Sequence, residues 1–406
     1  MKGFRPLGEG DLVPEIAEAG RDGAGLTDGP GSAADSGRAG SREPSVRGSS
    51  AVTVVQWVEV HRLAVAGREP AIAQDVGDRV ARVWLPRSRF ADVAALAAAT
   101  LTLGPDAGSF YDLGWAQSST GHPRQALANY EQALHRYREA GDRGNEAATL
   151  SNIGHVHNGL GEQQQALDYY RQALPTLREV GARAGEATIL NNIGSVHDRL
   201  GDRLQALDYY QQALPIMREV GARGGEAATL NNIGHVYDGL GDFEQALTYY
   251  RQALPIRREN GDRGGEATTL NNIGAAHNGL GDRQQALAYY RQALPILREV
   301  GDRAGEATTL TNVGHVYDGL GDRQQALDYY RQALPIRQGV GDRAGEAVTR
   351  FNIAMVHWAE RNLDLAIGEL EIVVDLDRQI GYPDLESDIF ALERVRQERA
   401  RSRQAT

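Results

Sequence analysis

The chain has 406 residues, no cysteine and a formal net charge of -11 at pH 7. Without cysteine, disulfides, thiolate nucleophiles and thiolate metal ligands are excluded. The negative charge disfavours binding to a phosphate backbone, and no Lys/Arg stripe interleaved with aromatic residues offsets it, so we expect no nucleic-acid partner.

The first fifty residues form a polar segment. Residues 1–50 are rich in Gly, Ser, Asp and Arg and have few large apolar side chains to offset the entropy of ordering, so we expect a disordered N-terminal arm. No basic stretch followed by an apolar one opens the chain, and the apolar window from Val52 to Val60 covers only about a third of a membrane span. We therefore expect a cytoplasmic protein without a membrane partner.

Residues 51–106 are more apolar and read as an irregular, partly helical lead-in. Within them, Phe90 to Leu103 predicts a helix that ends at Gly104-Pro105. This segment is expected to cover the first repeat.

From residue 107 the sequence repeats itself every forty residues, up to residue 383. We count seven units, of which the first and last are degenerate. Ala354 replaces the landmark glycine in the seventh copy. The glycine itself recurs at Gly114, Gly154, Gly194, Gly234, Gly274 and Gly314.

Each unit predicts two helices, which we call helix A and helix B. In one copy, Leu190, Ile193 and His197 follow the helical period, and helix A is expected from Arg183 to Leu200. Gly201-Asp202 then ends helix A and caps helix B, which continues to about Val220. Small residues and one ring form the inward face of helix B: Ala206, Tyr210 and Ala213.

The last segment, residues 384–406, predicts a capping helix and a short tail. One apolar stripe, Leu385, Ile389, Leu392 and Val395, faces a charged side, and a solenoid needs such a polar-backed helix on its last unit. We expect this helix from Leu385 to about Arg401.

The repeat resembles the tetratricopeptide repeat family, in the forty-residue variant of kinesin light chains and actinobacterial arrays. The resemblance covers residues 107–383 and implies an all-α fold, a right-handed α-α superhelical solenoid of helix pairs that binds proteins in a concave groove. It departs from the usual pattern by early prolines, Pro175, Pro215, Pro255, Pro295 and Pro335, which we expect to add regular curvature. The matching positions are Leu190, Ile193, Gly194, His197, Ala206, Tyr210 and Ala213.

One asparagine per repeat lies opposite the apolar stripe of helix A and is expected to line the groove. Its amide carries a donor and an acceptor, so it can hold the N–H and C=O of an extended peptide, as the equivalent asparagine does in peptide-binding relatives. Alternatively it is solvated, or it bonds to the neighbouring helix. A second asparagine, at Asn191, Asn231 and Asn271, is interpreted as an inter-repeat bond. The candidate peptide-binding ladder is Asn152, Asn192, Asn232, Asn272, Asn312 and Asn352.

The rest of the expected groove is small or neutral. His155, His235 and His315 follow one turn after the asparagine, and Arg199 is the single permanent cation on the central line. Aspartates at Asp198, Asp238 and Asp318 make one rim acidic. We therefore expect an extended neutral or basic segment as partner.

No catalytic or cofactor chemistry is predicted. The histidines diverge along a helix, and His155 and His235, which are two repeats apart, are expected to lie about 20 Å from each other, so metal binding is not expected. The recurrent Arg–Glu pair, from Arg143–Glu146 to Arg343–Glu346, is interpreted as a structural ladder because six identical active sites are improbable. No phosphate loop, zinc-protease motif or nucleophile elbow occurs, so the protein is expected not to be an enzyme and to need no cofactor.

Two other functions stay open. The array resembles the sensor portions of multi-domain NTPase regulators. It also offers a row of helix B tyrosines for self-assembly, although a monomer is favoured. These tyrosines are Tyr209, Tyr249, Tyr289 and Tyr329.

Overall fold

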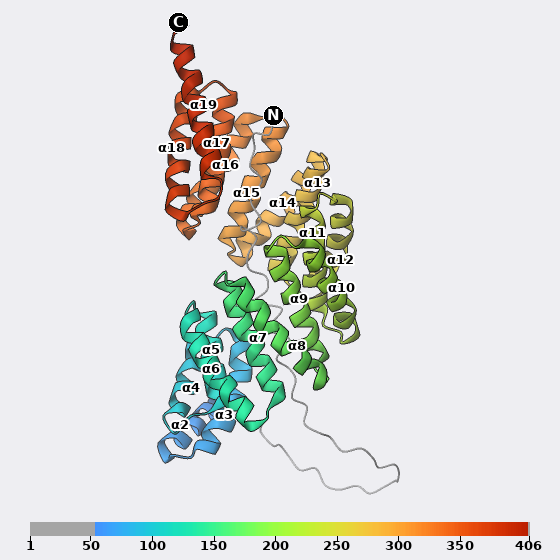
Figure 1. Cartoon of the computed structure of the whole chain (residues 1–406), viewed down its shortest axis with the longest axis vertical. Helices are drawn as coiled ribbons and strands as arrows, with labels where there is room; N and C mark the ends of the chain where they lie inside the picture. Colours follow the sequence, from blue (N-terminus) through green and yellow to red (C-terminus); the bar gives the residue numbers. More distant parts are fainter. Residues whose placement is uncertain (1–52, 405–406) are drawn as a thin grey trace. The chain divides into compact units, whose positions relative to one another are not determined.

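The computed structural model describes residues 53–404, and the arm at residues 1–50 lies outside the described residues (Figure 1). Residues 53–404 fold into eighteen α-helices and one short 3-10 helix, without a strand. The described chain divides within α10 (Arg203–Glu219) into two compact parts. The first comprises α2 to α9 with residues 211–220, and the second comprises residues 201–210 with α11 to α19.

The first part starts with three lead-in helices and a 3-10 turn. Their core includes Val76, Val80, Trp84 and Val93. The predicted helix at Phe90 is present as α4 and ends at Leu101, two residues before the expected end. The elements are α2 (Val54–Gly67), α3 (Pro70–Trp84), η1 (Leu85–Arg87), α4 (Phe90–Leu101), α5 (Ala107–Ser119), α6 (Pro123–Ala140), α7 (Arg143–Gly159), α8 (Gln163–Glu179) and α9 (Arg183–Arg199).

The second part stacks four further helix pairs and one closing helix. Each helix A packs on its own helix B, each helix B packs on the next helix A, and α19 packs on α18. The predicted all-α architecture of helix pairs with a C-terminal capping helix is therefore confirmed. The elements are α11 (Arg223–Gly239), α12 (Phe243–Glu259), α13 (Arg263–Gly279), α14 (Arg283–Val300), α15 (Arg303–Gly319), α16 (Arg323–Val340), α17 (Arg343–Ala359), α18 (Leu363–Ile380) and α19 (Leu385–Gln404).

The Gly-Asp dipeptide between the two helices of a repeat sets their boundary. Gly281 has φ +80°, a left-handed conformation that only glycine adopts without strain. Asp282 follows, and its carboxylate accepts a hydrogen bond from the backbone N–H of Gln285 at 3.3 Å. This satisfies one of the free N–H groups at the start of α14, as the capping pattern predicts.

The mid-helix prolines do not interrupt helix B. Pro255 lies inside α12 and Pro295 inside α14, and these helices run for 17 and 18 residues. Proline removes one backbone hydrogen bond, and burial of the helix on both neighbours compensates for that loss. The inward faces of α12 and α14 are buried through Ala246, Tyr250 and Tyr290.

Candidate functional site

The second asparagine joins consecutive helices A in the repeats that contain Asn231 and Asn271. Asn231 Oδ1 accepts hydrogen bonds from Asn272 Nδ2 at 3.3 Å and Thr269 Oγ1 at 3.4 Å. One repeat later, Asn271 Oδ1 accepts from Asn312 Nδ2 at 3.3 Å. The predicted inter-repeat role of Asn231 and Asn271 is confirmed. The same bonds fix the orientation of the candidate ladder asparagines, Asn272 and Asn312.

The ladder asparagines differ in their exposure. Asn152, Asn232 and Asn312 are partly exposed. Their counterparts in the alternating repeats are buried: Asn192 and Asn272 are each 6% exposed and Asn352 is 1% exposed. Asn152 donates to Tyr111 Oη of the preceding repeat at 2.9 Å. Here a tyrosine hydroxyl takes the place of the second asparagine as the acceptor of the inter-repeat bond. Three of the six candidates are thus partly exposed to solvent.

The candidate histidines accompany the exposed asparagines. His155, His235 and His315 are partly exposed, and the intervening repeats have Ser195 and Ala275 at this position. Burial lowers the pKa of His155 and His315, with smaller contributions from Arg199 and Arg283, respectively. These two rings are therefore neutral at pH 7 and offer hydrogen bonds without a charge.

Aspartates lie one turn beyond two of these histidines, at the expected acidic rim. Burial raises the pKa of Asp238, an effect that His235 opposes. Burial also raises the pKa of Asp318, and Arg323 opposes it. Both carboxylates are half-buried at the end of helix A, where a charge costs more than in water.

The rim also contains side chains that helical-wheel reasoning on helix A does not reach. Arg203 and Arg283, from the first turn of the preceding helix B, lie against the backbone at Gly239 and Gly319. Between them Phe243 lies against Gly279. We define the helix-A face of the second part by nine residues: Asn232, His235 and Asp238 on α11, Asn272, Ala275 and Asn278 on α13, and Asn312, His315 and Asp318 on α15.

The repeat geometry agrees with a comparison at the sequence level. The profile of the tetratricopeptide repeat matches residues 126–179, 185–259 and 265–339. The chain belongs to the tetratricopeptide repeat family. The comparison with curated protein sequences found no match to this chain.

Solved structures support the same fold. The similar structures include the quorum sensor NprR of B. thuringiensis in its apo form, with 16% identity, a TM-score of 0.58, and coverage of 70% of this chain and 82% of that one. A Rap protein complexed with Competence and Sporulation Factor has 15% identity, a TM-score of 0.55 and coverage of 80% and 98%. At such identities the similarity shows the fold alone.

A third similar structure is a signal transduction ATPase with numerous domains (STAND) that carries a tetratricopeptide repeat sensor, from Pyrococcus horikoshii. Its identity is 12% and its TM-score 0.61. The match covers 84% of this chain and 54% of that protein, so the present chain spans about half of it.

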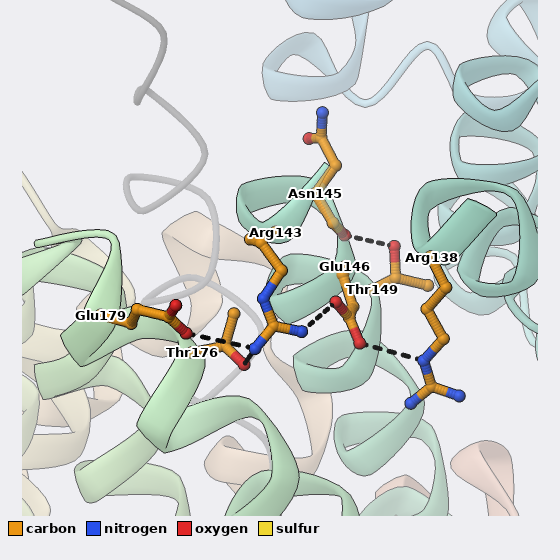
Figure 2. A network of polar contacts seen from close by, with 7 residues as sticks. All are labelled: Arg138, Arg143, Asn145, Glu146, Thr149, Thr176 and Glu179. Atoms are coloured by element: carbon orange, nitrogen blue, oxygen red, sulfur yellow. Dashed lines mark hydrogen bonds and ion pairs between the residues drawn. The ribbon is translucent and has the colours of Figure 1, made fainter. Parts of the chain in front are cut away.

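A charged ladder links consecutive tetratricopeptide repeats near the start of helix A, as Figure 2 shows for α7. Glu146, 6% exposed, accepts from Arg138 Nε at 3.0 Å and from Arg143 at 2.6 Å. Arg143 also reaches Glu179 at 3.3 Å on the following helix B. Equivalent pairs recur at Arg183–Glu186 and Arg263–Glu266. The ladder joins three successive helices, as its structural interpretation expects. The last predicted pair is not formed, because Arg343 contacts Gln379 and Glu346 contacts Arg350.

The helix B tyrosines are paired with rings of their own repeat. Tyr249 stacks on Tyr237 at 5.6 Å between ring centroids, and Tyr289 stacks on His277 at 5.4 Å. One face of each ring is therefore covered, which weakens the observation behind self-assembly through this row. Among residues 53–404, no three His, Asp or Glu side chains are arranged to hold a metal ion, and no helix is long and apolar enough to span a membrane.

Proposed function

We propose that the tetratricopeptide repeats hold an extended polypeptide segment along their helix-A surface and perform no reaction themselves. The observation that carries the proposal is the set of partly exposed amides, of which Asn152 and Asn312 are fixed in orientation by bonds to the preceding repeat. An amide with a fixed orientation loses little entropy when it binds, so it suits a role as a backbone clamp.

The asparagines of this clamp are those whose side chains are partly exposed to solvent. Asn152, Asn232 and Asn312 are partly exposed, and each is followed one turn later by a histidine. In the second part the partner backbone would bond to Asn232 and Asn312, with the rings of His235 and His315 alongside. In the first part Asn152 and His155 offer a separate pair of the same kind. Each net hydrogen bond contributes about 0.5–1.5 kcal/mol, so we expect an affinity in the micromolar range, about -8 kcal/mol. Arg199 would contribute one further donor in the first part.

A double substitution tests the clamp. Asn232→Ala together with Asn312→Ala should abolish capture of peptides selected on the wild-type chain from a random library. Loss of the Asn312 bond to Asn271 should lower the free energy of unfolding by roughly 1 kcal/mol. The helicity and the melting temperature of the double variant are therefore measured alongside its peptide binding.

Asn272→Ala is the matched control. It removes the same type of inter-repeat bond, here to Asn231, from a side chain that is only 6% exposed. It should lower stability as much as Asn312→Ala does and leave peptide capture intact. Unchanged capture by the double variant would refute the asparagine clamp.

A second candidate is a sensor array that works with an NTPase. The similarity to the STAND protein with a tetratricopeptide repeat sensor favours this possibility. Co-purification in which the one stable partner is an NTPase, bound through surfaces other than the helix-A face, would support it. In that case the double asparagine variant would retain the partner.

The expected partner is a neutral or basic segment, and the array is expected to act as a monomer. Light scattering across a concentration series tests the oligomeric state. A dimer at micromolar concentration would revive self-assembly as a function.

A further inference from the structure

Asp238 is a carboxylate that its surroundings leave poorly compensated. Its Oδ1 atom is buried and has no hydrogen-bond partner among the described residues. The side chain is half-buried overall, and burial raises its pKa. Because a buried oxygen without a donor is costly, the carboxylate gains from any cation that reaches its solvent side.

No neighbouring arginine supplies that cation. His235 on the same helix opposes the effect of burial, but no guanidinium contributes to the pKa of Asp238. On α14, Tyr290 also faces Asp238, and the carboxylate raises the pKa of its hydroxyl, as burial does more strongly. Arg203 lies over Gly239, the next residue of α11. The imidazole of His235 and the phenol of Tyr290 are thus the side chains that interact with the carboxylate.

The equivalent positions in three other repeats differ from Asp238. Asp318 has the same type of environment, but Arg323 opposes the rise in its pKa. In two repeats the position is an asparagine, Asn158 and Asn278. Asp238 is therefore an aspartate on the helix-A face without a compensating arginine, and it lies six residues after the partly exposed Asn232 on the same helix.

We propose that Asp238 is the specificity anchor of the helix-A face and takes an Arg or Lys side chain of the bound segment. This inference rests on the proposed function and deepens it, because the asparagine clamp binds backbone and by itself selects no side chain. The partner's cation would sit beside His235 and Asp238, while the adjacent strip of Ala275, Asn278 and Phe243 offers no charge. The bound segment would then carry one basic residue flanked by uncharged ones.

The chain provides its own matched variant. Asp238→Asn creates the residue that stands at this position in the repeats with Asn158 and Asn278, so the fold tolerates it. The variant removes a charge whose buried oxygen has no donor, so stability should stay equal or rise. Any loss of binding is then not due to misfolding. Asp318→Asn is the control for a general loss of acidic charge.

The experiment selects peptides of about twelve residues from a random library on the full-length wild-type chain. Winning peptides should carry Arg or Lys at one fixed position, and replacing that residue by Gln should weaken binding about tenfold in fluorescence anisotropy. Asp238→Asn should weaken binding of the basic peptide by the same factor. It should not weaken binding of the Gln peptide any further. The control Asp318→Asn should change the affinity for the basic peptide less than twofold.

The outcomes separate the anchor from the clamp. If peptides bind and depend on Asn232 and Asn312 but show no basic position, or if Asp238→Asn binds as tightly as wild type, the anchor is refuted and the clamp stands. If no peptide binds the wild-type chain, the clamp fails and the anchor fails with it. Coupling between Asp238 and one basic peptide residue supports both.

Discussion

Gly274 lies against the ring of Tyr290 so closely that a Cβ atom at Gly274 would be 2.6 Å from the Cε1 atom of the ring. Helix A and helix B of a repeat therefore approach as near as a glycine permits. Glycine and tyrosine recur together at these two positions through six units, whereas the last unit has Ala354 and Leu370. Both of the latter residues are buried in the C-terminal core.

The first prediction concerns this pair. Gly274→Ala should destabilise the second part by about 1–3 kcal/mol, because the added methyl group overpacks the interface. Tyr290→Leu should also destabilise it, by leaving a cavity. Combined, the two changes should cost at least 1 kcal/mol less than their sum, since they recreate the Ala354–Leu370 pair. Urea unfolding of the four proteins measures this coupling, and strict additivity would contradict it.

A second prediction concerns a gap in the charged ladder. Arg263 contacts Glu299 at 2.9 Å, but the equivalent partner of Arg303 is Gly339, and Arg303 is 54% exposed where Arg263 is 43% exposed. A Cβ at Gly339 meets no atom within 4 Å. Gly339→Ala should therefore stabilise by about 0.5 kcal/mol through helix propensity.

Gly339→Glu should add a further few tenths of a kcal/mol, because it restores the ion pair with Arg303. The difference between the Glu and Ala variants should disappear in 1 M salt, where exposed pairs are screened. Thermal melting at low and high salt gives the readout. A Glu variant less stable than the Ala variant at low salt argues against the pair.

A third prediction concerns Asp377 near the end of α18. Its side chain is 0% exposed, and neither carboxylate oxygen has a hydrogen-bond partner among the described residues. Leu297, 2% exposed, occupies the same position two repeats earlier. Asp377→Leu should raise the free energy of unfolding by about 1–3 kcal/mol.

Asp377→Asn separates the charge from the shape. It should give a smaller gain than the leucine, because the amide remains polar in an apolar site. Chemical denaturation at pH 7 measures both variants. A loss of stability in both would show that the carboxylate makes an interaction that the leucine and the amide cannot replace.

The fourth prediction concerns pH. Burial lowers the pKa of His277, against the opposing effect of Asp282, whose Oδ2 lies 3.6 Å from Nδ1. The folded state therefore binds a proton less readily than the unfolded state, in which the pKa is about 6.5. The contribution of His277 to stability is complete above this value and declines as the pH falls below it.

His277→Tyr should flatten this part of the stability profile. Tyrosine occurs at the same position in two other repeats, as Tyr237 and Tyr317. Each of them stacks on a helix B tyrosine of its own repeat, as His277 does on Tyr289. The difference in the free energy of unfolding between variant and wild type should be constant near pH 8 and should shift in favour of the variant below pH 6.5. The shift should stay under about 1 kcal/mol, because Asp282 opposes the effect of burial. Parallel profiles of wild type and variant would exclude His277 as a contributor.

Much of the fold follows from the sequence because the repeats are nearly identical. The Gly-Asp boundary at Gly281-Asp282 and the Arg143–Glu146 pair are local, and local sequence dictates both. The inter-repeat role of Asn271 was also predictable, because the wheel angle directs it toward the neighbouring helix. The regular curvature expected from the mid-helix prolines stays a prediction.

The candidate site was less accessible to the same reasoning. A helical wheel treats all six ladder asparagines alike, yet Asn232 is partly exposed and Asn272 is buried. The rim residues Arg203 and Phe243 come from the preceding helix B, so no wheel of helix A contains them. Their position one repeat earlier, at the first turn of helix B, was the signal that could have identified them.

By itself the sequence determined the repeat length, the helix boundaries, the family and the residue types on each helix face, because periodicity and capping act within about one turn. Only the tertiary structure decided which of the charged residues lack an opposite charge or a hydrogen-bond donor. That Asp238 lacks an arginine where Asp318 has Arg323, and that Asp377 is buried without a donor, depends on side chains brought together from different helices. Burial and charge compensation are properties of the packed assembly of helices, and a single helix does not encode them.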